Sequence, residues 1–367
     1  MIINDKANEL IQKLMQESPN TKLTIGLLYE GEMSFKLFDK TGEIPYQSYA
    51  YEIASISKVF TTSLFAKMLH EGKMDLNDSV AKYIPELDEN KYYPTLRRLA
   101  THTAGNGSEA LKYSEMVKVI VKGLLMHKRK KPSSYWTDFI MDYDKLVWHT
   151  KRYKFKDKDY KWLYTDYSIA LLGEAICQMK GIPYEKLMKE FLEVDLGLQN
   201  TKTITDRPDM LDGYFYNQNV GTMKGYRSDD YTAPAGGITS TAEDMLKFAK
   251  MNIEENPKFL ARAHEITPIE NPHFDMGLGW WVWNKGGNAK NPAFSHTGGS
   301  EGFSSSLTFL KNAKSAVVVL INTYGYDASE ISNAIFHGNL LGCTGRESCA
   351  CKNCELIQKI EKSTKED

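Results

Sequence analysis

The sequence predicts an α/β (α+β) fold in which helices flank an antiparallel sheet and a mainly helical subdomain is inserted into the chain. Its segments follow one another as a helix, two strands, a long helical region, three strands and a closing helix, an order typical of helices packed on an antiparallel sheet. The run from Ala316 to Ile321 is continuously apolar, which predicts a strand buried on both faces. With 367 residues, 42% of them hydrophobic, the chain can bury such a core without disulfide staples.

The first part of the chain predicts a helix, a hairpin and a second helix. Apolar runs at 23–29 and 33–38 are separated by a short stretch containing Gly31, which predicts a β-hairpin. No Gly or Pro occurs from Ser55 to Glu71, and Gly72 follows, so a helix of about four turns is expected there. The first helix is predicted from apolar residues at helical spacing: Ala7, Leu10, Ile11, Leu14 and Met15.

The last part of the chain predicts two capped helices and three strands. Ser240 to Glu243 fits a capping box, in which the Ser240 hydroxyl accepts a hydrogen bond from the Glu243 amide at the start of a helix. Asp327 to Glu330 is expected to cap the closing helix. The strands are predicted at Gly277–Trp283, Phe303–Phe309 and Ala316–Asn322.

Changes in composition suggest how the chain is divided. Pro85, Pro94 and the Gly105–Gly107 loop precede a region that lacks alternating segments. We therefore expect a discontinuous α/β sheet domain at 1–98 and 226–342, a mainly helical insertion at 99–225, and a polar, Cys-containing tail at 343–367.

Charge and hydropathy exclude several classes of protein. The 46 Lys and Arg nearly balance the 47 Asp and Glu, so no nucleic-acid partner is expected. The longest aliphatic run has six residues, against roughly 18 for a membrane span, so no transmembrane segment is expected. Asp5 and Glu9 interrupt the N-terminal apolar positions, so the chain as written has no signal peptide and is expected to be cytoplasmic, or exported if it is a trimmed form. Metalloprotease, phosphate-loop and dinucleotide-binding motifs are also missing from the sequence.

Ser55-Ile-Ser-Lys58 is the strongest candidate for chemistry. It places a hydroxyl and an amine one turn apart on one face of a helix, where the amine can approach the hydroxyl. A serine at a helix start also lies near free backbone amides and the positive end of the helix dipole, which favours acyl transfer. Ser79 to Lys82 has the same spacing, but it lies in a short polar segment, whereas Ser55 follows a strand-like stretch and opens a long helix.

The wider sequence resembles the class C β-lactamase and DD-peptidase-like serine hydrolases, a family related to penicillin-binding proteins. The resemblance covers about 22–340 and implies a β-lactamase/transpeptidase-like fold. It rests on ordered segments: Glu52–Lys58, Leu76–Pro85, Leu99–Gly105, Tyr164–Asp166, Leu171–Gly173, Pro234–Gly237, Gly277–Trp281 and His296–Gly299.

The resemblance implies a role for each matching residue and no cofactor. Ser55 would be the nucleophile, Lys58 its proton-handling neighbour and Tyr164 the second catalytic group. A phenol titrates near pH 10, so Tyr164 is expected to need either a lowered pKa, which the Lys58 cation would provide, or a relay for its proton. The Gly299 amide would join the Ser55 amide as an oxyanion hole. Substrate would contact Asp166 and a strand edge formed by His296, Thr297 and Gly298.

Two departures from the family pattern bear on substrate choice. Many β-lactamases carry Lys where this chain has His296, and a neutral His binds a substrate carboxylate less strongly than a fixed cation. Asp166 stands where the best-known members have Asn, and a carboxylate receives an ammonium group or pairs with Lys58 instead of donating an amide hydrogen bond. The first departure tilts the expectation away from efficient β-lactam turnover, and His at this place resembles the DD-carboxypeptidase and D-peptidase branch. The second tilts the expectation toward peptides with a nearby ammonium group or toward esters.

The functional hypothesis is a serine hydrolase that acylates Ser55 and acts on D-amino-acid-containing peptides, as a DD-carboxypeptidase or D-peptidase. A β-lactamase or carboxylesterase with the same site is one alternative. A penicillin-binding or sensor protein that is acylated without turning over is another, and a non-catalytic interaction protein is a third. The expected partner is a small-molecule or peptide substrate.

Two further features are open to more than one interpretation. Residues 118–161 hold 13 Lys or Arg against 5 Asp and form either a solvated cap over the cleft or a contact for an anionic surface. The cysteines near the C-terminus are a weak candidate for a metal site, with disulfides or free thiols as the alternatives. They are Cys343, Cys349, Cys351 and Cys354.

Overall fold

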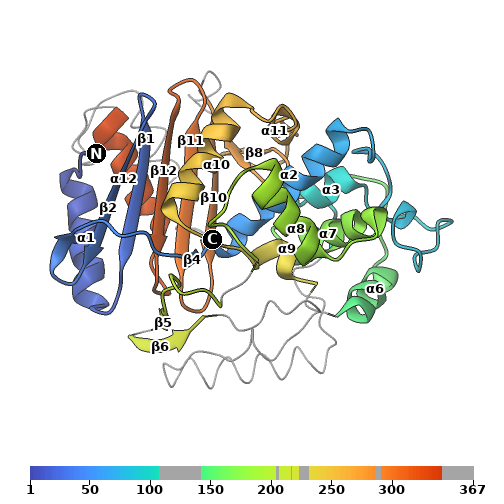
Figure 1. The fold of residues 1–367 in the computed structure, drawn as a ribbon. Coiled ribbons are helices and arrows are strands. Elements are labelled where there is room, and N and C mark those ends of the chain that lie inside the picture. The colour runs from blue at the N-terminus through green and yellow to red at the C-terminus, as the bar shows by residue number, and fades with distance from the viewer. Residues whose placement is uncertain (107–141, 204–205, 216, 223–230, 286–290, 341–367) are drawn as a thin grey trace.

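A computed structural model describes residues 1–106, 142–203, 206–215, 217–222, 231–285 and 291–340 (Figure 1). The helices are α1 (Asp5–Glu17), α2 (Ser57–His70), α3 (Leu96–Ala100), α6 (Tyr143–Arg152), α7 (Asp166–Lys180), α8 (Tyr184–Glu190), α9 (Ala233–Gly236), α10 (Ala242–Glu254), α11 (Leu260–Ala263) and α12 (Ala328–Leu340). The strands are β1 (Leu23–Tyr29), β2 (Glu32–Asp39), β3 (Gly42–Ile44), β4 (Tyr51–Glu52), β5 (Gly213–Phe215), β6 (Gln218–Gly221), β7 (Thr239–Ser240), β8 (Asp275–Met276), β9 (Trp281–Trp283), β10 (Ala293–Gly299), β11 (Ser304–Leu310) and β12 (Ser315–Ile321).

One antiparallel sheet of eight strands organises the fold, in the order β3-β2-β1-β12-β11-β10-β9-β8. The predicted hairpin is confirmed as β1 and β2, which pair from Leu23 with Phe38 to Tyr29 with Glu32. β1 pairs on its other edge with β12, so the N-terminal hairpin and the C-terminal strands lie side by side in the centre of the sheet (Figure 1).

Strand β12 is buried on both faces, as its apolar run predicts. Its alternate residues Val317, Val319 and Ile321 belong to the core under α1 and α12. Val318 and Leu320 belong to a second core on the opposite face, which contains side chains of α2 and α10. Successive side chains of a strand point to opposite faces, so one continuous apolar segment supplies both cores.

Helix α2 runs through the larger core, and almost all of its residues are buried. Its Thr61 hydroxyl donates a hydrogen bond of 2.7 Å to the Pro234 carbonyl in α9. Gly173 lets α7 approach the same helix, because a Cβ at this position would lie 2.5 Å from the Pro234 ring. Three segments distant in sequence therefore meet around the start of α2.

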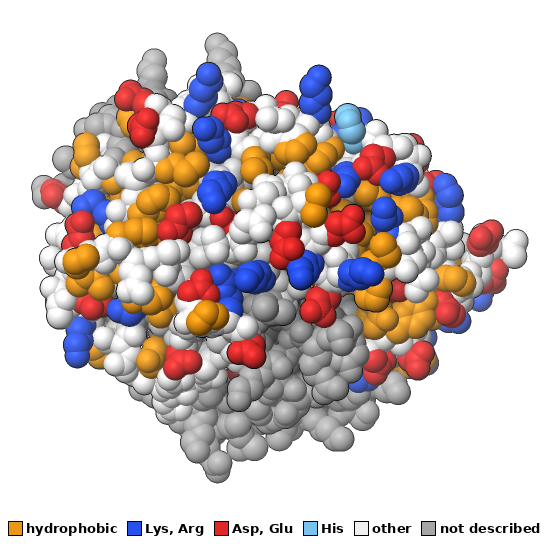
Figure 2. All heavy atoms as spheres, viewed as in Figure 1, with side chains coloured by type: hydrophobic (Ala, Val, Ile, Leu, Met, Phe, Trp, Pro, Cys, Tyr) orange, Lys and Arg blue, Asp and Glu red, His pale blue; other side chains and the backbone are white. Residues whose placement is uncertain are grey.

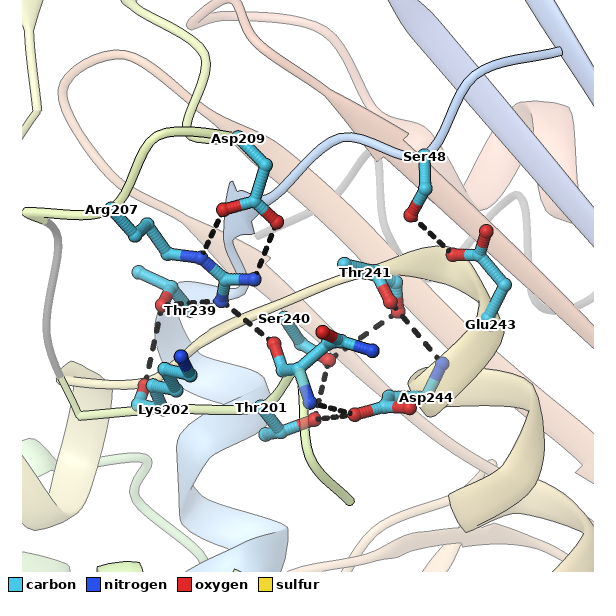
Figure 3. Close-up of polar contacts among 11 residues, drawn as sticks. Ser48, Thr201, Lys202, Arg207, Asp209, Thr239, Ser240, Thr241, Glu243 and Asp244 are labelled. Atoms are coloured by element: carbon cyan, nitrogen blue, oxygen red, sulfur yellow. Dashed lines mark hydrogen bonds and ion pairs between the residues drawn. The ribbon is translucent and has the colours of Figure 1, made fainter.

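The predicted capping box is wrong by one residue. Thr241 is the N-cap of α10 and accepts from the Asp244 amide, so Glu243 does not occupy the reciprocal position (Figure 3). Ser240 is part of β7, which pairs with β4, and its hydroxyl lies 2.8 Å from the Thr201 hydroxyl. Because the Ser240 hydroxyl is hydrogen-bonded to Thr201, it does not cap the helix, which starts one residue later.

The strand predicted at Gly277–Trp283 is shorter than expected. Only β9 is extended, because the Gly277 amide donates to the Trp280 carbonyl in a tight turn. Gly279 has a φ of +74° in this turn, and a Cβ there would lie 2.5 Å from the Thr62 hydroxyl. β4 falls in the strand-like stretch before Ser55, whereas its partner β7, the pair β5–β6 and the edge strands β3 and β8 had no recognised sequence signal. The division into a sheet domain and an inserted helical domain stays a prediction.

The surface carries mixed charge. On the face in Figure 2, Lys and Arg side chains are interspersed with Asp and Glu and with hydrophobic groups. This view agrees with the near balance of 46 basic and 47 acidic residues. Within the residues described, no helix is long and apolar enough to cross a membrane.

Asp244 supports a stability prediction. Its buried carboxylate accepts from the Asn200 amide at 2.7 Å and the Thr201 hydroxyl at 3.2 Å (Figure 3). Asp244→Ala leaves both donors without this acceptor and should lower the free energy of unfolding by about 2–3 kcal/mol. The neighbouring Glu243→Ala removes a hydrogen bond to the exposed Ser48 and should cost less than about 1 kcal/mol. Urea unfolding followed by circular dichroism measures both, and equal losses would contradict the assignment.

Candidate active site

The start of α2 brings the predicted serine and lysine together. Ser55 lies in the 3₁₀ turn Ala54–Ile56, and Lys58 follows in the first turn of α2. The Lys58 Nζ donates to the Ser55 Oγ over 2.9 Å. The ammonium is completely buried and also contacts the Ala235 carbonyl at 2.8 Å and Asp166 Oδ1 at 2.6 Å. Three oxygens thus surround the three N–H donors of the ammonium group, and the Tyr164 hydroxyl is a further hydrogen-bond partner.

Tyr164 lies beside this cluster. Thr165 caps α7 by accepting from the Tyr167 amide, which places Tyr164 immediately before the helix and Asp166 as its first residue. The centre of the Tyr164 ring is 4.8 Å from the Lys58 Nζ. The structure therefore brings together the hydroxyl, amine and phenol that the sequence singled out.

Strand β10 carries the second group of predicted residues. β9 pairs with β10 only as far as Ser295, so the stretch from His296 to Gly299 pairs with β11 alone within the described sheet. Gly298 lies against the segment before Ser55, because a Cβ there would lie 2.2 Å from the Ile53 carbonyl oxygen. Gly299 is exposed with open space where a side chain would stand, and Thr297 is half-buried.

The second Ser-x-x-Lys segment occupies a different environment. Ser79 caps the short 3₁₀ turn Val80–Lys82, and its hydroxyl accepts from the Ala81 amide. Lys82 is exposed and contacts the Asp78 carboxylate at 2.9 Å. The sequence context separated the two segments correctly, because only Lys58 is directed at the hydroxyl three residues before it.

Comparisons with known proteins agree on one family. The family model described as Beta-lactamase matches residues 47–340. The chain belongs to the Beta-lactamase family. A β-lactamase of Pseudomonas fluorescens is 24% identical over 294 residues, which is 77% of this chain and 75% of that protein. The family resemblance inferred from the motifs is thus confirmed.

Solved structures of this family share the fold. A class C β-lactamase from Rhodobacter sphaeroides has a TM-score of 0.71 at 19% identity and covers 91% of this chain and 99% of its own. A β-lactamase/D-alanine carboxypeptidase from Pseudomonas syringae has a TM-score of 0.69 at 20% identity and covers 90% and 96%. The predicted β-lactamase/transpeptidase-like fold is therefore correct.

The protonation of the Lys58–Tyr164 pair differs from the expectation for this family member. Burial lowers the pKa of Lys58, but the Asp166 carboxylate and the Tyr164 phenol act against it, and the balance raises that pKa. Burial raises the pKa of Tyr164, Lys58 lowers it, and Asp166 adds to the rise. The pKa of Tyr164 is raised and not lowered, because burial and Asp166 outweigh the Lys58 cation, so of the two routes allowed by the sequence only the relay of its proton stays a prediction. Both groups are protonated at neutral pH in the free site.

Two neutral histidines flank the Tyr164 ring. His296 stacks on Trp281 at 4.8 Å, and its Nδ1 lies 2.6 Å from the Thr297 carbonyl. A carbonyl only accepts, so Nδ1 carries the hydrogen and Nε2 is a buried acceptor without a hydrogen-bond partner among the described residues. The His102 ring lies 4.9 Å from the Tyr164 ring at an interplanar angle of 38°, and its Nδ1 accepts from the Thr165 amide, so the hydrogen is on its Nε2.

Sequence reasoning assigned no role to His102, Trp281 or the Ala235 carbonyl. His102 and Ala235 lie in segments that were noticed only for their family resemblance, and Trp281 lies in a segment that was also predicted as a strand. The Ala235 contact has no signal in a sequence, because any residue has a carbonyl, whereas the aromatic neighbours of His296 follow from the pairing of β9 with β10.

Other sequence candidates lie wholly or partly outside the described residues. The cysteine cluster, Cys343 to Cys354, is among them, and so is the 118–141 part of the basic segment. In its described remainder, Arg152 lies over the Trp148 ring at 4.7 Å and Lys158 over the Tyr160 ring at 4.6 Å. Some of its basic groups thus contact aromatic rings of the same segment. Contact with an anionic surface and metal binding stay predictions.

The buried histidines predict acid sensitivity. The pKa of His102 and of His296 falls from 6.5 to about 3, through burial first and the Lys58 cation second. Below pH 6.5 the unfolded chain binds protons that the folded chain does not, so stability is complete above this pH and is lost toward pH 3. Each of these two histidines should lower the free energy of unfolding by about 2 kcal/mol at pH 5 relative to neutral pH.

Urea midpoints at pH 7.5 and pH 5 test this expectation. His149 and His264 also have a lowered pKa and add to the loss. His296→Gln removes one of these four groups and should make the loss between the two pH values smaller. The control is His70→Gln, at the exposed end of α2, which should leave the loss unchanged. An undiminished loss in His296→Gln would contradict the role of His296.

Proposed function

We propose that this member of the Beta-lactamase family is a serine hydrolase that forms an acyl-enzyme at Ser55, with Lys58 and Tyr164 moving protons. The observation that carries the proposal is the 2.9 Å contact of the buried Lys58 Nζ with the Ser55 Oγ. A fully buried ammonium aimed at a hydroxyl is costly to maintain, and it is typical of a site where proton transfer is needed.

The proposed reaction has two steps. The Lys58–Tyr164 pair first loses one proton to solvent. The Ser55 Oγ then attacks a carbonyl carbon, its proton passes to the deprotonated pair, and the oxyanion accepts from the Ser55 and Gly299 amides. The bond to the leaving group then breaks, the leaving group takes the proton from the pair, and an ester to Ser55 remains. Water attacks that ester, the acyl group leaves as a carboxylic acid, and Ser55 recovers its proton.

The proposed substrate is a D-amino-acid-containing peptide, cleaved as by a D-peptidase or DD-carboxypeptidase. His296 is neutral and fully buried, so it supplies no fixed cation for a substrate carboxylate. Asp166, 38% exposed in its side chain, suits a substrate ammonium group. Asp166, His296, Thr297 and Gly298 are therefore proposed as the substrate-contacting residues.

A second candidate is β-lactam or ester hydrolysis by the same residues. It is favoured by the relatives, several of which are named β-lactamases, and by the open space at Gly299. An acylated sensor that does not turn over is a third candidate. It is favoured by the ion pair of Lys58 with Asp166, which opposes deprotonation of the amine needed for deacylation.

Substitution of the nucleophile tests the proposal. Ser55→Ala should abolish labelling by a fluorophosphonate probe and lower hydrolysis of a D-peptide or p-nitrophenyl ester by at least about 10³-fold. Ser79→Ala is the matched control and should leave both unchanged. Activity that survives Ser55→Ala would contradict the mechanism. Labelling of wild type without turnover of peptide, ester or cephalosporin would identify a sensor, and absence of labelling would favour a non-catalytic interaction protein.

Asp166 provides a pH-dependent test. The free Lys58–Tyr164 pair must lose a proton before it can accept one from Ser55, and Asp166 opposes this loss by raising the pKa of both groups. Asp166→Asn should therefore move the acid limb of the kcat/KM profile to lower pH by about one unit. The profile of wild type and variant with one p-nitrophenyl ester measures the shift. A limb that stays in place or moves upward would contradict the role given to Asp166.

A further inference from the structure

The backbone just before Ser55 is held from two sides. The Ile53 amide donates to the Ile238 carbonyl at 3.1 Å, beside the pairing of β4 with β7. The Ile53 carbonyl accepts from the Ser305 hydroxyl at 2.9 Å. Ser305 is 1% exposed and belongs to β11, on the far side of β10 from β9. A strand distant in sequence thus reaches the turn that carries the nucleophile.

The same hydroxyl lies next to the strand residue that precedes Gly299. Gly298 and Ser305 are register partners, and the Ser305 Oγ lies 3.4 Å from the Gly298 carbonyl oxygen. A Cβ on Gly298 would lie 2.5 Å from that Oγ and 2.2 Å from the Ile53 oxygen. The Ser305 side chain therefore fills the contact between the nucleophile turn and the end of β10.

The turn needs such support because its backbone is strained. Ala54, between Ile53 and Ser55, has a φ of +46°, in the left-handed region that residues with a side chain avoid. Strained conformations persist where the surrounding structure fixes them. A second link lies on the other side of Gly299, where the Ser300 hydroxyl donates to the buried Glu52 carboxylate over 2.7 Å.

We propose that Ser305 is a positioning residue for the oxyanion hole. Its hydroxyl fixes the Ile53 carbonyl and, through the strained Ala54, the direction of the Ser55 amide relative to the Gly299 amide. This inference rests on the proposed function, in which these two amides bind the oxyanion. Ser305 itself lies behind the backbone and touches no reacting atom.

The neighbouring Ser304 provides a matched control. It is also buried, and its hydroxyl also donates to a backbone carbonyl, that of Thr323, at 3.0 Å. Adjacent strand residues point to opposite faces, so Ser304 makes an equivalent hydrogen bond away from the nucleophile turn. Ser304→Ala and Ser305→Ala should therefore lower the urea midpoint to a similar extent.

The test compares acylation of Ser55 in the two variants with a p-nitrophenyl ester as probe. Removing one oxyanion donor typically costs about 10²–10³-fold, and misdirecting one should cost less, so Ser305→Ala should lower the acylation rate constant by about tenfold. The KM for the ester should change less than about twofold, because ground-state contacts stay in place. Ser304→Ala should leave both values within about twofold of wild type.

Infrared difference spectra of the acyl-enzyme give a readout that a merely structural role would not move. Hydrogen bonds in an oxyanion hole lower the stretching frequency of the acyl carbonyl, so Ser305→Ala should shift the band to higher wavenumber and Ser304→Ala should not. If Ser305→Ala fails to fold, Ser305→Cys retains the shape with a weaker donor and should shift the band in the same direction.

The outcomes separate the two proposals. If wild type forms no ester at Ser55, the proposed function fails. If wild type is acylated but the Ser305 variant matches the Ser304 variant in rate and carbonyl frequency, the proposed function survives and the positioning role is overturned.

Discussion

The buried ammonium of Lys58 is the constraint on which the rest of the site depends. A charge removed from water is stable only when its partners replace the lost hydration, and here those partners are a hydroxyl, a carbonyl and a carboxylate. They come from the turn before α2, from α9 and from the first residue of α7. The contact of Gly173 with Pro234 and the hydrogen bond of Thr61 to the Pro234 carbonyl hold these helices at the required separation. The packing of α2, α7 and α9 is therefore what places the hydrogen-bond and ion-pair partners of Lys58.

The same charge determines the state of its aromatic neighbours. It adds to burial in keeping His102 and His296 neutral, and it draws the pKa of Tyr164 downward while Asp166 draws it upward. The Asp166 carboxylate neutralises the Lys58 charge, so the surroundings of this ion pair in the described site are neutral polar groups and aromatic rings. The two histidines have opposite tautomers, so the buried Nε2 is a donor in His102 and an acceptor in His296, and their ring centres lie 4.9 and 6.1 Å from that of Tyr164.

Much of this arrangement could be predicted from the sequence, and the rest could not for physical reasons. The β1–β2 hairpin and the doubly buried β12 follow from apolar periodicity, which is a local property. Ser55 and Lys58 share one helical turn, so their contact could be anticipated, whereas the approach of Tyr164 was known only from family resemblance. The net pKa of Tyr164 depends on burial and on Asp166 together, and neither is visible without the fold. The prediction of Ser240 as the helix cap was wrong because Ser240 makes tertiary contacts instead. It belongs to β7, which pairs with β4, and its hydroxyl is hydrogen-bonded to Thr201.

In the turn before Ser55, a contact between residues distant in sequence holds the backbone in a conformation that Ala54 would not adopt by itself. An alanine at φ +46° is unfavourable by about 1 kcal/mol or more, and a glycine at this position would relieve the strain. A glycine would also leave the turn free to rotate, and the direction of the Ser55 amide would then vary. Retaining Ala54 makes the turn stiff, but only if the peptide on its N-terminal side is fixed independently. Ile53 meets that condition, since its amide is bound by Ile238 and its carbonyl by Ser305. The close approach of the two segments is instead made possible by Gly298 in β10. A glycine there adds little flexibility, because pairing with β11 already restricts its backbone.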